Sequence, residues 1–236
     1  MPALLTVRDL AVRFGDRVVL EAVNFELAAG EILAVVGPNG SGKTVLLKAL
    51  LGLIPSTGKI EWAAGTRAGY VPQKIVPDRG LPLRVREVLE AKARFARLPA
   101  AEIGVVCETV GLGPELLEAV AGLLSGGQFQ KVLIAFALLG HPNIILFDEP
   151  TASLDELSEE RIYDLLPRLQ TESGMTVILV SHDLSVVFRH ATKVLCLSRG
   201  ITCSGPPKEV LTPATLEALY SAPSKYYVHH EEHRRR

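Results

Sequence analysis

The hydrophobic positions of this chain form short strand-like runs separated by longer helical stretches. Residues 4–29 alternate between apolar and polar positions and are predicted to form a β meander. Residues 32–36 are instead continuously apolar, as in a strand that is buried on both faces of a parallel sheet. A helix is predicted over residues 45–51, directly after a glycine-rich loop. The first quarter of the chain therefore indicates an antiparallel sheet followed by strand, loop and helix.

Downstream, further buried strands alternate with helical periodicity. The predicted strands are 58–62, 69–73, 144–147, 176–180, 193–198 and 201–203, and the predicted helical segments are 85–123 and 156–170. This order predicts an α/β fold with a helical insertion. We expect one domain over residues 1–222, with a helical subdomain at about 81–139, and a polar tail rich in His and Arg over 223–236.

Composition narrows the class of protein. The chain has 236 residues, a net charge of −1 and a pI of about 6.6, so no overall field favours nucleic acid as a partner. No apolar stretch reaches the roughly twenty residues of a spanning helix, and no signal peptide is evident, so we expect a soluble intracellular protein. Cys107, Cys196 and Cys203 form no CxxC pair, which predicts free thiols in a reducing cytosol.

A glycine-rich loop between the strand at 32–36 and the following helix predicts a phosphate site. Its backbone N–H groups can converge on phosphate oxygens at the positive end of the helix. The lysine adds a point charge for the β- and γ-phosphates, and the threonine hydroxyl is a Mg²⁺ ligand. The loop consists of Gly37, Pro38, Asn39, Gly40, Ser41, Gly42, Lys43 and Thr44. A merely tight turn is the alternative, which the strand–loop–helix context disfavours.

Two carboxylates follow the buried strand at 144–147. Because ligands of parallel α/β sheets bind at the carboxyl ends of strands, both should face the nucleotide. Asp148 suits Mg²⁺, directly or through water, and Glu149 suits the general base that activates a water. The alternative is a solvated pair of acids in a loop.

A second glycine-rich turn precedes these acids and opens a helix; it consists of Ser125, Gly126, Gly127 and Gln128 after Leu124. With the other motifs in this order, residues 4–210 resemble the ATPase subunit of an ABC transporter. The resemblance implies a P-loop NTPase (RecA-like) core, an N-terminal antiparallel β subdomain, and a helical insertion that carries the LSGGQ signature. It also implies a head-to-tail dimer, in which Ser125 to Gln128 of one copy contact the ATP of the other. Read alone, the turn is an ordinary helix cap.

The resemblance assigns roles to further residues. Gln73 corresponds to the glutamine that senses Mg²⁺ and the lytic water, and His182 to the histidine that holds the γ-phosphate, although an ordinary loop histidine is the alternative. The loop that crosses the dimer interface corresponds to Ser153, Leu154 and Asp155. Phe14 stands where an aromatic ring stacks on adenine, with core packing as the alternative, and Thr57 is assigned to the ATP site. The family's usual arginine is replaced by Phe136.

The sequence indicates the transported cargo less clearly than it indicates ATP hydrolysis. Residues 70–74, 81–85, 194–197 and 202–206 look like ATPases of zinc and manganese importers. The tail could bind a metal or simply be a disordered polar terminus. The expected partners are a second copy of the chain and two transmembrane permease subunits, which the chain would bind on the cytoplasmic face of the cell membrane. A metal-binding extracytoplasmic protein is expected as an indirect partner, and nucleic acid is not expected as a partner. The alternatives are a metal-chelate importer, an iron–sulfur assembly or DNA repair ATPase, and a scaffold without turnover.

Overall fold

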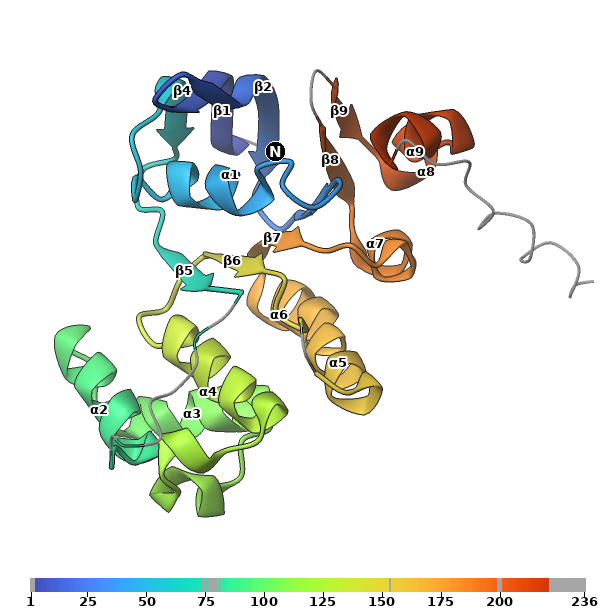
Figure 1. Ribbon diagram of the computed structural model, residues 1–236. Coiled ribbons are helices and arrows are strands. Elements are labelled where there is room, and N and C mark those ends of the chain that lie inside the picture. The colour runs from blue at the N-terminus through green and yellow to red at the C-terminus, as the bar shows by residue number, and fades with distance from the viewer. Residues whose placement is uncertain are drawn as a thin grey trace, which may run out of the picture.

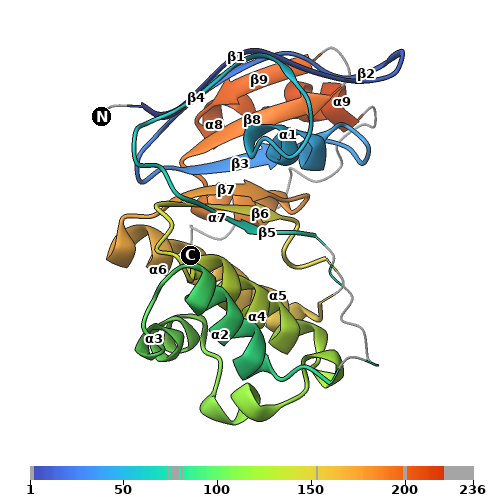
Figure 2. The same ribbon diagram turned by 90° about the vertical axis from the view of Figure 1, so that its left-hand side faces the viewer.

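The computed structural model describes residues 3–73, 75, 80, 82–152, 154–198 and 201–220, with only the backbone of residues 201 and 202. Two sheets and a lobe of helices are stacked along one direction, and the large sheet lies in the middle (Figures 1 and 2). The small sheet has the order β2-β1-β4 and consists of β1 (Ala3–Phe14), β2 (Arg17–Ala28) and β4 (Thr57–Trp62). The large sheet has the order β5-β6-β7-β3-β8-β9 and consists of β3 (Ile32–Val36), β5 (Ala68–Val71), β6 (Ile144–Asp148), β7 (Thr176–Val180), β8 (Lys193–Ser198) and β9 (Ile201–Gly205).

Helices cover both faces of the large sheet. They are α1 (Lys43–Leu50), α2 (Val85–Phe95), α3 (Ala101–Val110), α4 (Gly126–Leu138), α5 (Glu156–Tyr163), α6 (Leu165–Ser173), α7 (Leu184–His190), α8 (Pro207–Val210) and α9 (Pro213–Tyr220), with 3-10 turns η1 (Pro114–Glu118) and η2 (Ala121–Leu123). One core joins α1 and the small sheet to one face, and a second core joins α2 to α6 to the opposite face. The continuous apolar runs of β3, β6 and β7 are thus buried on both faces, as predicted.

The predicted meander is a single long hairpin of two twelve-residue strands. The short strands expected from the sequence merge, because the register between β1 and β2 shifts at irregularities instead of at turns. Asp9 and Ala22 adopt positive φ angles of 48° and 49°, and the Asp9 amide donates to Asn24 Oδ1 at 2.8 Å. Bulges of this kind allow a strand to continue through residues that break its alternation.

Both predicted helical segments are interrupted. The stretch 85–123 divides into α2, α3, η1 and η2, with Gly111 in the left-handed conformation at the end of α3. The stretch 156–170 divides at Asp164, between α5 and α6. Pro167 lacks the N–H that would donate to the carbonyl of Tyr163, so the helical hydrogen bonds break at this point. The predicted helical subdomain at about 81–139 contains α2 to α4, and its bounds remain a prediction.

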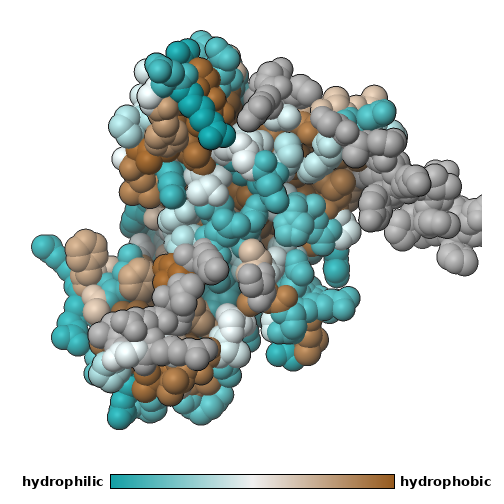
Figure 3. Space-filling view, viewed as in Figure 1, coloured by the Kyte–Doolittle hydropathy of each residue, from teal (hydrophilic) through white to brown (hydrophobic). Residues whose placement is uncertain are grey.

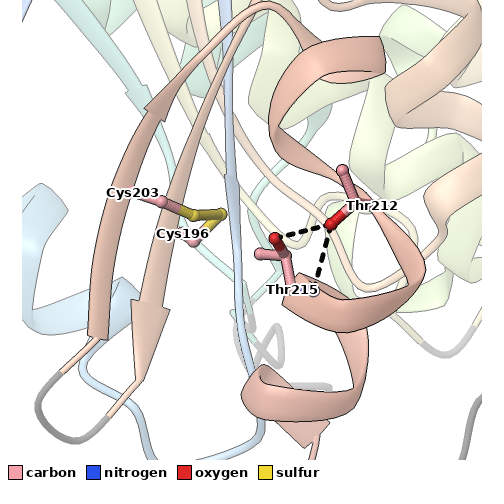
Figure 4. Close-up of a disulfide and its surroundings, with 4 residues drawn as sticks. All are labelled: Cys196, Cys203, Thr212 and Thr215. Atoms are coloured by element: carbon pink, nitrogen blue, oxygen red, sulfur yellow. Dashed lines mark hydrogen bonds between the residues drawn. A yellow bond between two sulfur atoms is a disulfide. The ribbon is translucent and has the colours of Figure 1, made fainter.

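The prediction of three free thiols is wrong: Cys196 and Cys203 form a disulfide (Figure 4). The two residues lie directly opposite each other in the β8–β9 hairpin, with Cα atoms 4.9 Å apart. Neither a CxxC pattern nor an even cysteine count reveals this pair, because the hairpin register alone brings the residues together. Cys107 is buried and free. The tail, residues 223–236, lies outside the described residues, among which no helix has the length and apolarity to cross a membrane.

Candidate nucleotide site

A cavity of about 490 Å³ opens at the carboxyl ends of the parallel strands, beside the start of α1. Strands β3, β6 and β7 are parallel neighbours, so the loops that follow them meet at this edge of the sheet. The cavity is lined by Phe14, Arg17, Val19, Asn39, Gly40, Gly42, Lys43, Thr44, Val45, Gln73 and Glu149. Residues from three separate predicted motifs are therefore brought to one place.

The phosphate loop is shaped by its glycines. Gly37, Gly40 and Gly42 all have positive φ angles, of 152°, 78° and 100°. At Gly37 a β-carbon would lie 1.9 Å from the backbone oxygen of Leu197, so that position accepts only glycine without rearrangement. Gly42 precedes α1 with no side-chain cap, which leaves the first N–H groups of the helix free to bind an anion.

The loop also contains a buried cation and an unpaired hydroxyl. Lys43 is 5% exposed, and its Nζ donates to the backbone oxygens of Gly37 at 2.9 Å and Pro38 at 3.2 Å. The buried Oγ of Ser41 has no hydrogen-bond partner among the described residues. Buried polar atoms are normally paired, so the loop has hydrogen-bonding capacity to offer a ligand.

The two acids at the end of β6, Asp148 and Glu149, have different partners. Asp148 is 1% exposed; its Oδ1 accepts a hydrogen bond from Thr44 Oγ1 at 2.9 Å and its Oδ2 one from Tyr70 at 3.2 Å. Burial raises the pKa of Asp148, while these two hydrogen bonds act in the opposite direction. Glu149 has a positive φ of 49°, which turns its carboxylate toward the cavity. There it accepts a hydrogen bond from Gln73 Nε2 at 2.5 Å and lies 3.6 Å from Lys43 Nζ.

The donor set at Thr44 and Asp148 fits a magnesium ion. A hydroxyl and a carboxylate oxygen lie 2.9 Å apart, close enough to share one small cation. Mg²⁺ prefers hard oxygen ligands and is commonly held by one or two protein groups together with phosphates and water. No cluster of three or more His, Cys, Asp or Glu occurs in the described part of the chain, as would be needed for an all-protein metal cage.

The cavity mouth carries residues that the sequence only partly predicted. Phe14 is 52% exposed and lines the cavity, so it is not a core residue. Arg17 and Val19 from β2 also line it and were not identified from the sequence; only the hairpin geometry places them there. Thr57 lies instead in β4, opposite Ala11, and is not among the lining residues. The structure therefore does not support the assignment of Thr57 to the nucleotide.

The second glycine turn lies outside this cavity. Ser125 caps α4. Its Oγ accepts a hydrogen bond from the backbone N–H of Gln128 at 3.3 Å, and its own backbone N–H donates to the side-chain Oε1 of Gln128 at 3.0 Å. A β-carbon on Gly127 would lie 2.8 Å from Ser158 Oγ. Asp155 caps α5 and accepts from the Ser158 amide at 3.0 Å. The signature turn and the start of α5 thus form one packed unit; Ser153, in the same predicted loop, is outside the described residues.

His182 follows β7 at the same sheet edge and is exposed. The Ser181 amide before it donates to the Val35 backbone oxygen at 3.3 Å, beside the start of the phosphate loop. Asp183 after it caps α7 through the Ser185 amide. The backbone on both sides of the imidazole is therefore fixed, while the side chain itself is accessible.

Comparisons with known proteins agree with this geometry. The family model described as "ABC transporter" matches residues 20–152. A protein named zinc import ATP-binding protein ZnuC from Cereibacter sphaeroides is 41% identical over 92% of this chain and 88% of its own length; one with the same name from Paracoccus denitrificans is 41% identical over 98% and 91%. A solved structure titled as an inward-facing conformation of a putative metal-chelate type ABC transporter superposes with a TM-score of 0.85 at 30% identity, covering 94% of this chain and 90% of that one. The chain belongs to the ABC transporter family, as an ATP-hydrolysing subunit.

Proposed function

We propose that this chain is the motor of a zinc importer, which hydrolyses MgATP as a head-to-tail dimer bound to two membrane permease subunits on the cytoplasmic face. The observation that carries this proposal is the convergence of Lys43, Gln73 and Glu149 on one cavity beside a glycine loop, with the buried Asp148 hydrogen-bonded to Thr44 in the cavity wall. The names of the relatives supply the cargo.

Each residue at the cavity has a task that follows from its position. The phosphate loop binds the β- and γ-phosphates through its N–H groups and the Lys43 ammonium. To do so Lys43 exchanges its contact with Glu149 for one with the phosphates, which frees that carboxylate to take a proton from water. Gln73 holds Oε2 of Glu149 and so orients the base. A magnesium ion held by Thr44 and Asp148 supplies charge neutralisation on the phosphates.

The remaining predicted residues complete the site from a second copy. In this proposal Ser125, Gly126, Gly127 and Gln128 of one subunit reach the γ-phosphate held by the other, with Asp155 beside them. Their position outside the subunit's own cavity supports this arrangement. His182 is exposed at the edge where that phosphate would lie, and it is free to hold the phosphate and the attacking water.

An apolar groove of about 460 Å³ offers a place for the permease. It lies between β5 and the helical lobe, and its lining includes Pro72, Ile75, Leu83, Phe129 and Phe136. Exposed hydrophobic surface on this lobe is visible in Figure 3. Exposed apolar surface of this kind indicates a protein interface. Because the groove adjoins the segment that carries Gln73, docking there would act on the residue that orients Glu149. An extracytoplasmic metal-binding protein would contact the permease and not this chain.

The identity of the cargo is tested in a strain from which the gene encoding this chain has been deleted. The strain is grown with a chelator and complemented with the wild type or with Lys43→Ala, which removes the phosphate-binding ammonium. The proposal is supported if the wild type restores growth and Lys43→Ala does not. It also requires that, among the added metals, only zinc restores growth of the uncomplemented strain. Rescue by manganese alone would contradict zinc as cargo, and rescue by a metal chelate would favour the class of importer named in the solved structure. Co-purification with a membrane complex, rather than a soluble one, excludes the iron–sulfur assembly alternative.

A further inference from the structure

Tyr70 makes a contact with the magnesium-binding acid that the assigned chemistry does not use. Its hydroxyl donates to Asp148 Oδ2 at 3.2 Å, while Thr44 donates to the other oxygen at 2.9 Å. Asp148 is almost completely buried, and these two hydroxyls are the side-chain donors that it has among the described residues. The orientation of the carboxylate is therefore set by one residue on α1 and one on β5.

The sheet register explains how Tyr70 reaches this acid. Tyr70 on β5 is the parallel partner of Leu146 on β6. Side chains two positions apart along a strand project from the same face, so Leu146 and Asp148 share the face that Tyr70 occupies. The ring of Tyr70 is partly buried against the core that contains the apolar residues of α1, and its length carries the hydroxyl to Asp148. A side chain much shorter than tyrosine would not reach Asp148 from this position.

The two hydroxyls have different fates when MgATP binds. In the proposed MgATP complex Thr44 would help to hold the magnesium ion as well as donating to the acid, so its hydroxyl would have a second task. Tyr70 has no such second task and keeps its hydrogen bond.

We propose that Tyr70 is a positioning residue for the magnesium ion, whose hydroxyl holds the Asp148 carboxylate so that Oδ1 stays directed at Thr44. The proposal rests on the proposed MgATP chemistry at the same site. A purely structural tyrosine would change the stability of the fold when altered, whereas a positioning tyrosine changes how strongly magnesium and ATP bind together.

The test is Tyr70→Phe, which removes one oxygen atom. ATP affinity is measured by calorimetry in Glu149→Gln protein, in which hydrolysis is slow, once with a chelator and once with saturating Mg²⁺. The gain in affinity on adding Mg²⁺ should fall about three- to tenfold in Tyr70→Phe, as expected for the net contribution of one ordinary hydrogen bond, with the metal-free affinity unchanged. The free Mg²⁺ concentration for half-maximal hydrolysis in the parent protein should rise by a similar factor.

Tyr163→Phe is the matched control, because it removes a buried tyrosine hydroxyl that is bonded to Thr151 and not to Asp148. It should leave the magnesium gain unchanged. In an Asp148→Asn background the effect of Tyr70→Phe should vanish. An unchanged gain in Tyr70→Phe, or an effect that persists without Asp148, overturns the assignment of Tyr70. If the Glu149→Gln parent itself shows no magnesium-dependent ATP binding, the proposed function fails as well.

Discussion

Replacing Glu149 by glutamine keeps the shape of the side chain and removes its charge. In the structure one carboxylate oxygen lies 3.6 Å from Lys43 Nζ, and the other accepts the Gln73 amide at 2.5 Å. The glutamine retains an oxygen for Gln73 but can neither accept a proton nor pair with Lys43. We therefore expect turnover to fall while ATP affinity rises.

Both magnitudes follow from the geometry. Loss of a general base lowers turnover by about 10²- to 10⁴-fold. The pair of Lys43 and Glu149, at 3.6 Å, attracts by about 4.6 kcal/mol at an effective dielectric constant of about 20. Solvation of the separated charges offsets most of this energy. A remainder of about 1 kcal/mol would tighten ATP binding about fivefold, because Lys43 no longer has to leave Glu149.

Phosphate release at saturating MgATP measures the fall in turnover, and calorimetric titration with ATP measures the rise in ATP affinity. Glu172→Gln is the matched control, because Glu172 is a 66% exposed carboxylate on α6 whose partner is Arg168. It should change neither quantity. Hydrolysis by Glu149→Gln within tenfold of the wild type would refute the role of Glu149 as base, and weaker ATP binding would refute the competition for Lys43.

Three further substitutions test other parts of the structure. In denaturant unfolding, Gly37→Ala should lower the free energy of unfolding by about 1–3 kcal/mol more than Gly40→Ala does. The reason is that an added β-carbon would lie 1.9 Å from a backbone oxygen at Gly37 and would have no atom within 4 Å at Gly40. Equal losses of stability in the two variants would contradict this packing. Asp148→Asn should raise the free energy of unfolding of the nucleotide-free protein, because burial disfavours the charged form of Asp148. The same variant should lower the rate of phosphate release at least about 100-fold. A variant less stable than the wild type would contradict the stability prediction. Cys203→Ser should lower the free energy of unfolding by about 2.5 kcal/mol without reductant and have no such effect with a dithiol present; alkylation of all three thiols in unreduced, denatured wild type would show that the disulfide with Cys196 does not form.

The parts of the molecule that sequence alone predicts are those with a strong local signal. The strands β3, β6 and β7 each contain at least four consecutive apolar residues, and such runs have few alternatives to a buried strand. Parallel topology then places the ends of these strands at one edge, which is why Lys43 and Glu149 line one cavity and Asp148 bonds to Thr44 in its wall.

The parts that sequence did not predict depend on register. The contact of Tyr70 with Asp148 requires the pairing of β5 with β6, and the disulfide requires the pairing of β8 with β9. Arg17 reaches the nucleotide cavity only because β1 and β2 form one long hairpin. The register of a strand pair leaves no periodic signal within either strand, so no local pattern reveals which residues lie opposite each other.

The claim that two copies build each nucleotide site is tested most directly by the oligomeric state. Sedimentation velocity of Glu149→Gln with MgATP should show a dimer, and the same protein with MgADP a monomer. Adding Ser125→Arg, which places a bulky cation in the signature turn, should return the ATP-loaded protein to a monomer without loss of ATP binding. A monomer of Glu149→Gln at saturating MgATP would contradict the composite site.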